Sequence, residues 1–248
     1  MNSKMCSVAL ASLFTVTMPQ YGWAQDQEGE LFGGALSGNV MFSSDYVFRG
    51  ITQTSNLPQI QGDLAWSHSS GMYAGIWASN TNFGGGDASM EFDPFIGFSR
   101  GIADTGLSYD IGYWSYNYPG GDELNYWEIY GILSHQTGPL GLSGSVWYAD
   151  NYFGDDFFDD VSSLAYDATV SYQMTDKWSV SARVGQQTFD ETAGLADQDY
   201  LYYDVGASMA WQDYTLGLRW HDTDGVEPDL ATESDSDGSL VFSLTRSF

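Results

Sequence analysis

Few side chains in this sequence are of types and spacings that could carry out a chemical reaction. The run Gly97-Phe98-Ser99-Arg100-Gly101 matches the G-x-S-x-G pattern, in which hydrolases hold a serine nucleophile on a sharp strand-to-helix turn. Here a short turn and another alternating run follow the serine, so no such turn is expected. The histidines, His68, His135 and His221, show neither metal-ligand spacing nor a local serine partner. We therefore predict that the protein is not an enzyme, with a hydrolase built on Ser99 as an alternative.

The N-terminus has the features of a secretory signal peptide at residues 1–24. Lys4 supplies a positive charge, Val8–Met18 is apolar, and Gly22 and Ala24 are the small residues of a cleavage site. The apolar stretch is about half the length that a membrane-spanning helix needs. The only cysteine, Cys6, lies inside this segment, so the mature chain, residues 25–248, is expected to lack a thiol. A single domain is predicted for it.

Composition excludes further classes of function. The formal net charge is -26, and a surface of this sign repels the phosphates of nucleic acids. No nucleic acid partner is therefore expected. Aromatic residues make up 16% of the chain, which is unusual for a disordered acidic protein.

The elements that must position any functional residue are β-strands, because apolar and polar residues alternate at a spacing of two. In the run that begins at Leu107, for example, Tyr109, Ile111 and Tyr113 share one face, and Ser108 and Asp110 share the other. Very short turns at 69–71, 103–106, 137–139, 175–177 and 212–213 interleave with longer connections at 49–57, 80–89, 117–123, 150–162, 189–199 and 222–238.

This punctuation predicts 12 long antiparallel strands, an even number. Alternating short turns and long loops are typical of outer-membrane barrels. The predicted fold is thus an all-β, up-and-down transmembrane barrel in the outer membrane of a Gram-negative bacterium, with both termini periplasmic. A soluble β-sandwich is the alternative fold.

Aromatic residues support a location in lipid, because their rings favour the membrane interfaces. Twelve are predicted to form the interfacial girdles: Trp66, Trp77, Tyr109, Tyr113, Trp127, Tyr148, Tyr172, Trp178, Tyr203, Trp211, Tyr214 and Trp220. The last strand ends on Phe248, the form of C-terminus that the outer-membrane assembly machinery recognises. Lipid and this machinery are the expected macromolecular partners.

The face assignment places charges inside the barrel. If Val40, Phe42, Tyr46 and Phe48 face lipid, Arg49 faces the lumen at the extracellular mouth. The predicted pore-lining residues are Asp45, Arg49, Asp63, Asp110, Glu128, Asp167, Arg183, Asp204 and Arg219. Such charges can select permeating ions, or the arginines can simply pair with the aspartates. Both interpretations are compatible with the pattern.

The stretch SGNVMFSSDYVFRGITQT at 37–54, with Pro58, IQGDLAW and GMYAGIWASN after it, resembles the TorF-type putative porins. The closing FSLTRSF is similar too. This resemblance implies a proteobacterial outer-membrane barrel and a presumed pore, and it brings no catalytic residues with it.

The predicted function is a porin-like channel for passive diffusion. Twelve strands should leave a narrow or partly plugged lumen, which suits ions and small solutes. Acidic residues cluster in the loops at 150–160, 189–199 and 222–238, where they would favour cations. Carboxylates of this kind can bind calcium or magnesium, but no EF-hand or regular Asp-Gly repeat is present, so no cofactor is predicted. A non-conducting structural or adhesive barrel is the other alternative.

Overall fold

A computed structural model of the chain describes residues 31–83, 88–154, 161–190 and 198–248. The predicted signal peptide, residues 1–24, lies outside the described residues.

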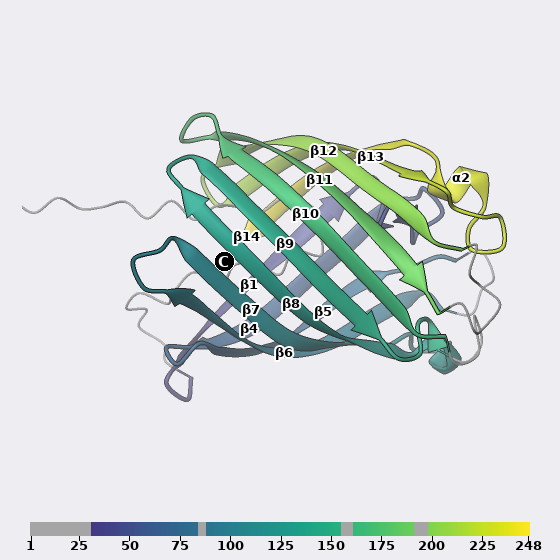
Figure 1. Cartoon of the computed structure of the whole chain (residues 1–248), viewed down its shortest axis with the longest axis horizontal. Helices are drawn as coiled ribbons and strands as arrows, with labels where there is room; N and C mark the ends of the chain where they lie inside the picture. Colours follow the sequence, from purple (N-terminus) through teal and green to yellow (C-terminus); the bar gives the residue numbers. More distant parts are fainter. Residues whose placement is uncertain (1–30, 84–87, 155–160, 191–197) are drawn as a thin grey trace, which may run out of the picture.

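Twelve antiparallel strands form one closed barrel, in which each strand pairs with its neighbours in the sequence and β1 closes against β14 (Figure 1). This confirms the predicted fold class and number of strands. The strands are β1 Gly34–Ser43, β4 Gln59–His68, β5 Met72–Asn80, β6 Met90–Ile102, β7 Leu107–Tyr116, β8 Tyr126–Thr137, β9 Leu140–Ala149, β10 Ser163–Gln173, β11 Trp178–Phe189, β12 Tyr200–Trp211, β13 Tyr214–Asp224 and β14 Ser239–Ser247. Short elements are β2 Val47–Phe48, β3 Ile51–Thr52, the 3-10 turn η1 Asp122–Leu124 and α2 Glu233–Ser236.

The alternation in the sequence becomes the two faces of the barrel wall. On β10, Leu164, Tyr166 and Val170 are exposed on the outer face, whereas Ser163 and Ala165 are buried on the inner face. The outer surface is therefore apolar along the strands, as a lipid-facing surface must be. Several predicted girdle residues lie on this outer face with large exposed fractions, among them Tyr172, Trp178, Trp211 and Trp220.

One girdle prediction is wrong. Trp77 shares the inward parity of the buried Tyr73 on β5, and its ring lies 5.5 Å from the ring of Tyr46, centroid to centroid, in the barrel interior. The side chain is therefore part of the packed lumen and not of a membrane interface.

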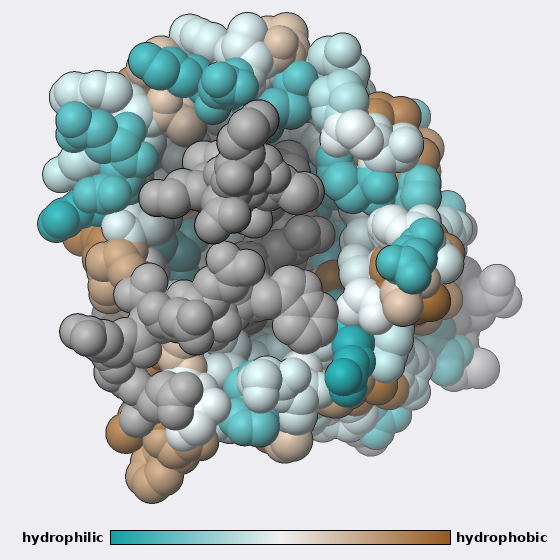
Figure 2. Space-filling view, turned by 90° about the vertical axis from the view of Figure 1, so that its left-hand side faces the viewer, coloured by the Kyte–Doolittle hydropathy of each residue, from teal (hydrophilic) through white to brown (hydrophobic). Residues whose placement is uncertain are grey.

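The two ends of the barrel differ in their connections. Short turns join the strands at one end, and longer loops and α2 lie at the other end (Figure 1). β1 begins and β14 ends at the short-turn end. Figure 2 looks onto this end and shows hydrophilic residues around the rim, with hydrophobic residues on the outer flanks. Within the described ranges, no helix has the length and apolar character to span a bilayer.

The first long connection departs from the expected pattern. β1 ends at Ser43, and residues 44–58 turn into the lumen, where β2 and β3 form a two-stranded hairpin separate from the barrel sheet. We call residues 44–58 the lumen hairpin. Tyr46 and Phe48, which were expected to face lipid, are only 5% and 6% exposed and pack inside the barrel. That prediction is wrong because the strand ends before these residues.

Candidate functional site: the barrel lumen

The lumen hairpin turns at Arg49 and Gly50, between the paired residues Phe48 and Ile51. The φ angles of Arg49 and Gly50 are 46° and 86°. Two positive φ values are what a two-residue type I′ turn requires, and glycine adopts them without strain. A side chain at position 50 would also clash, because a Cβ there would lie 2.3 Å from Cγ2 of Thr223. The hairpin tip is therefore in close contact with the opposite wall.

Arg49 anchors this tip inside the barrel. Its Nη2 donates to Oε2 of Glu128 at 2.8 Å, and its Nη1 donates to Oε1 of Gln187 at 2.8 Å. The guanidinium carbon lies 4.7 Å from the ring centroid of Phe48. Arg49 is 5% exposed and Glu128 0%, so both charges are withdrawn from water. Removing either partner would leave a buried, uncompensated charge. The ion-pair interpretation of Arg49 thus describes its geometry, and the expected position at the extracellular mouth is wrong.

The base of the hairpin is held by Asp45, another predicted pore-lining residue. Its Oδ1 accepts hydrogen bonds from the hydroxyls of Thr52 at 2.5 Å and Thr54 at 2.8 Å. Its Oδ2 is buried with no partner among the described residues. Burial raises the pKa of the Asp45 carboxyl, although the two hydroxyls oppose the shift. Asp45 therefore shapes the hairpin and does not line an open channel wall.

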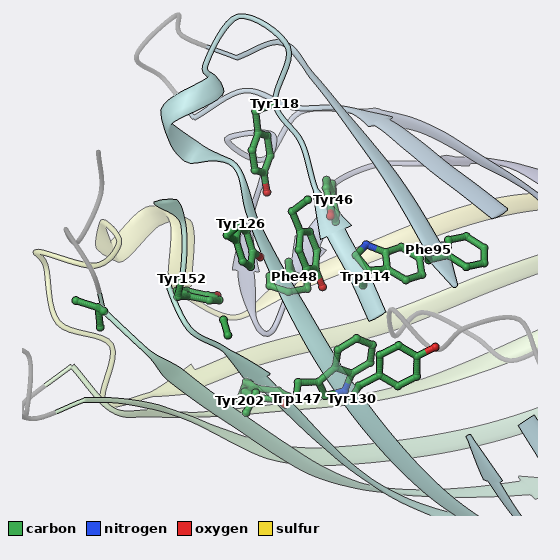
Figure 3. Packing of buried hydrophobic residues seen from close by; sticks show 14 of the residues in the cluster. Tyr46, Phe48, Phe95, Trp114, Tyr118, Tyr126, Tyr130, Trp147, Tyr152 and Tyr202 are labelled. Atoms are coloured by element: carbon green, nitrogen blue, oxygen red, sulfur yellow. The ribbon is translucent and has the colours of Figure 1, made fainter. Parts of the chain in front are cut away.

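Aromatic side chains fill the lumen around the hairpin. Rings from the hairpin and from the surrounding strands and loops converge in this half of the barrel (Figure 3). Tyr116 and Tyr126 stack with ring centroids 4.3 Å apart, and Tyr130 stacks on Trp147 at 4.5 Å. Figure 3 labels Tyr46, Phe48, Phe95, Trp114, Tyr118, Tyr126, Tyr130, Trp147, Tyr152 and Tyr202. This half of the lumen is a packed core.

Three of the predicted lumen residues form one charge cluster near the middle of the barrel. Nε of Arg183 donates to Oδ2 of Asp204 at 2.7 Å, and Nη1 of Arg219 donates to the other oxygen of the same carboxylate. Arg219 also donates through Nη2 to Oγ of Ser181 at 2.5 Å. One aspartate thus balances two arginines, and the cluster carries a net positive charge.

The other three acids of the prediction lie on the inner face without an arginine. Asp63 accepts from Nδ2 of Asn39, Asp110 accepts from the Tyr73 hydroxyl at 2.5 Å, and Asp167 accepts from Oγ of Ser145 at 2.6 Å. None of the three forms an ion pair within the described part of the chain. The structure therefore brings Arg49 and Glu128 together, and Asp204 with Arg183 and Arg219, while the remaining carboxylates stay separate.

Two interior acids were missed. Glu91 and Asp93 are each 1% exposed on the inner face of β6. Glu91 accepts from the Tyr118 hydroxyl at 3.1 Å, and Asp93 accepts from Nε1 of Trp114 at 2.9 Å. Their shared parity, opposite to that of Met90 and Phe92, was the signal that could have identified them.

The half of the lumen toward the short turns is lined by small polar residues. Inward positions on successive strands carry serines, each opposite in parity to an apolar outer neighbour. Those residues are Ser37, Ser67, Ser99, Ser108, Ser134, Ser143, Ser171, Ser179, Ser181 and Ser208. Small side chains fill less of the barrel cross-section than aromatic ones, so this half retains space.

Ser99 gives no support to a hydrolase. It lies within β6, opposite Asp110 on β7, and it is not on a strand-to-helix turn. Among the described residues, no group of three or more His, Cys, Asp or Glu side chains is placed to hold a metal ion. Parts of two acidic loops, residues 155–160 and 191–197, lie outside the described residues.

Between the hairpin tip and the middle of the barrel lies a cavity with about 560 Å³ of empty space, part of it continuous with solvent. Phe48 and Arg49 line it from the hairpin side, and Asp167, Thr169 and Arg183 line it from the barrel wall. Aromatic and charged side chains therefore meet around one space.

Comparison with known families places the chain. Residues 28–248 match a model described as a bacterial protein of unknown function, Gcw_chp. The chain belongs to this family. No curated protein matches it.

Solved structures share the fold at low sequence identity. A structure titled KdgM porin superimposes with a TM-score of 0.58 at 8% identity, covering 86% of this chain and 99% of that one. A second KdgM structure, in complex with disordered oligogalacturonate, gives 0.57 at 8% identity over the same shares. OprD from Pseudomonas aeruginosa covers 88% of this chain and 65% of its own at 9% identity, with a TM-score of 0.42. The similarity to KdgM shows a porin-type barrel fold.

Proposed function

We propose that this chain forms a narrow outer-membrane channel for passive diffusion of ions or small solutes, with a preference for cations. The observation that carries the proposal is the combination of an apolar outer surface with a polar, serine-lined inner face. Lipid requires the first, and a water-filled path requires the second. The resemblance to TorF-type putative porins points to the same function and to export through the segment at residues 1–24.

The preference for cations follows from the charges in the lumen. All three interior arginines are engaged with carboxylates, by way of Glu128 and Asp204. Asp63, Asp110 and Asp167 have no such partner in the described part of the chain, and they lie toward the serine-lined half. Unpaired carboxylates around a narrow path attract cations and repel anions.

The lumen hairpin limits the size of the solute. One KdgM structure was solved with oligogalacturonate. In this chain the aromatic cluster fills the corresponding half of the barrel, and the unpaired carboxylates repel an acidic oligomer. We therefore expect ions and small solutes, and not oligosaccharides, to pass.

Purified full-length protein in planar bilayers tests the proposal. We expect discrete conductance steps, and a reversal potential on the cation side in a KCl gradient. Asp63→Asn and Asp110→Asn should each move that potential toward zero, whereas Asp213→Asn, in an exposed turn, should leave it unchanged. A silent bilayer at high protein load, with folding verified by heat-dependent gel mobility, would contradict a channel and favour a structural or adhesive barrel.

A further inference from the structure

The cavity beneath the lumen hairpin holds two opposite charges side by side. Thr169 on β10 pairs with Arg183 on β11, and Asp167 is two residues along β10 on the same inner face. Diagonal neighbours of this kind have backbones about 7–8 Å apart. Nevertheless, Asp167 and Arg183 form no ion pair with each other among the described residues. A space therefore remains between an acid and a base.

Each of these charges has hydrogen-bonding capacity left over. Arg183 uses Nε on Asp204, so its two terminal nitrogens have no hydrogen-bond partner in the described part of the chain. Asp167 accepts through Oδ2 from Ser145, with the Tyr202 hydroxyl 3.5 Å away, and its Oδ1 accepts from no described residue. Oγ1 of Thr169 is also buried without a partner. A withdrawn polar group without a partner is costly, so these atoms favour a bound molecule that satisfies them.

The ligand must offer both an anionic and a cationic group. A simple cation would satisfy only Asp167, and a simple anion only Arg183. A molecule with a carboxylate and an ammonium group a few ångströms apart satisfies both at once, through a guanidinium fork and a carboxylate acceptor. Ile132 and Phe48 add apolar surface to the same cavity, where an aliphatic side chain can lie.

We propose that the cavity beneath the lumen hairpin binds a small zwitterion with the chemistry of an α-amino acid, its carboxylate on Arg183 and its ammonium group on Asp167. The inference rests on the proposed function, because it names a solute class for the channel. The free space of about 560 Å³ is within the range of small-molecule sites.

Titration of the purified full chain in detergent tests binding without requiring conduction. Trp147 lines the cavity, so its fluorescence reports on occupancy. We expect a saturable change with L-alanine. N-acetyl-L-alanine, which lacks the ammonium charge, and L-alanine amide, which lacks the carboxylate, should each bind at least about tenfold more weakly, equivalent to about 1.4 kcal/mol. Glycerol should give no saturable change. Equal binding of glycerol, or equal binding of the two derivatives, would overturn the proposal.

Two variants localise the site. Asp167→Asn removes the acid with little change in shape, and Arg183→Lys retains a charge for Asp204 while removing the terminal fork. Each should weaken L-alanine binding at least about tenfold. The matched controls Asp213→Asn and Arg246→Lys, both on exposed side chains, should bind like the wild type. Wild-type affinity in both cavity variants, or the absence of saturable binding to the wild type, would contradict the site.

Conductance of the same preparation separates this proposal from the proposed function. Conduction without L-alanine binding would overturn the zwitterion site and leave the channel standing. Binding without conduction would overturn the channel and leave the site standing. In a conducting preparation, L-alanine should reduce the current in the wild type more strongly than in Asp167→Asn.

Discussion

The two halves of the lumen are built from different side chains, although the same 12 strands enclose both. Toward the long loops, the lumen hairpin and a cluster of aromatic rings pack as densely as a protein core. Toward the short turns, serines line the wall and carboxylates remain without ionic partners. The difference teaches that strand number alone does not set the pore. One inserted segment, residues 44–58, decides where the lumen is filled.

Replacing the lumen hairpin should break this contrast most strongly. Ser43 and Gln59 are paired neighbours on β1 and β4, so a short Asn-Gly turn can join the two strands in place of residues 44–58. We expect single-channel conductance to rise several-fold, because the filled half would open. Heat-dependent gel mobility would verify that the variant is folded. Unchanged conductance in a folded variant would mean that the hairpin does not set the path.

Arg49→Ala should loosen the hairpin while leaving its backbone in place. The change leaves Glu128 buried without its partner, a loss of about 3–5 kcal/mol for pairs of this kind. We expect the hairpin to undock in part, seen as larger and noisier conductance steps and as faster proteolysis within residues 44–58. Glu128→Ala should produce the same phenotype. If the double variant is as impaired as the sum of both single variants, the ion pair is not the anchor.

Gly50→Ala should have a smaller effect in the same direction. The φ angle of 86° disfavours any residue with a Cβ, and that Cβ would approach Thr223 to 2.3 Å. The expected cost is about 1–2 kcal/mol of hairpin docking. Combining Gly50→Ala with Thr223→Ser, which removes the contacted methyl group, should recover part of it, as measured by proteolysis rates. No recovery would assign the effect to the backbone alone.

The smallest expected effect is a pH dependence at Asp45. Its folded-state pKa is raised above the ordinary value of 3.8, so the protonated form favours the docked hairpin. Docking should therefore be strongest below pH 3.8 and weaken as the pH rises through the shifted pKa. Asp45→Asn should abolish this dependence and leave the conductance steps unchanged in size. Persistence of the same pH profile in Asp45→Asn would assign it to another group.

Much of the barrel could be predicted from the sequence because strand periodicity, turn length and face alternation are local properties. Runs such as Leu164–Tyr172 state directly which side chains face outward. Face parity also placed Asp63, Asp110 and Asp167 on the inner wall, since it depends only on counting by twos along a continuous strand.

The lumen hairpin could not be predicted in the same way. Tyr46 and Phe48 continue the parity of Val40 and Phe42, so alternation alone extends the strand through them. Two local signals contradicted this extension: polar Ser44 in the lipid-facing parity, and the Arg49-Gly50 pair, which suits a two-residue turn. The contact of Arg49 with Glu128 joins residues far apart in the sequence, and no local pattern specifies it.

The reversal potential of the wild-type channel across a tenfold KCl gradient tests the central claim most directly. Potassium and chloride have similar mobilities in water, so the sign reports the charge preference of the lumen itself. The account predicts a potential on the potassium side, approaching about 59 mV for ideal selectivity. A potential at zero or on the chloride side would contradict it, because the unpaired carboxylates would then not control the path.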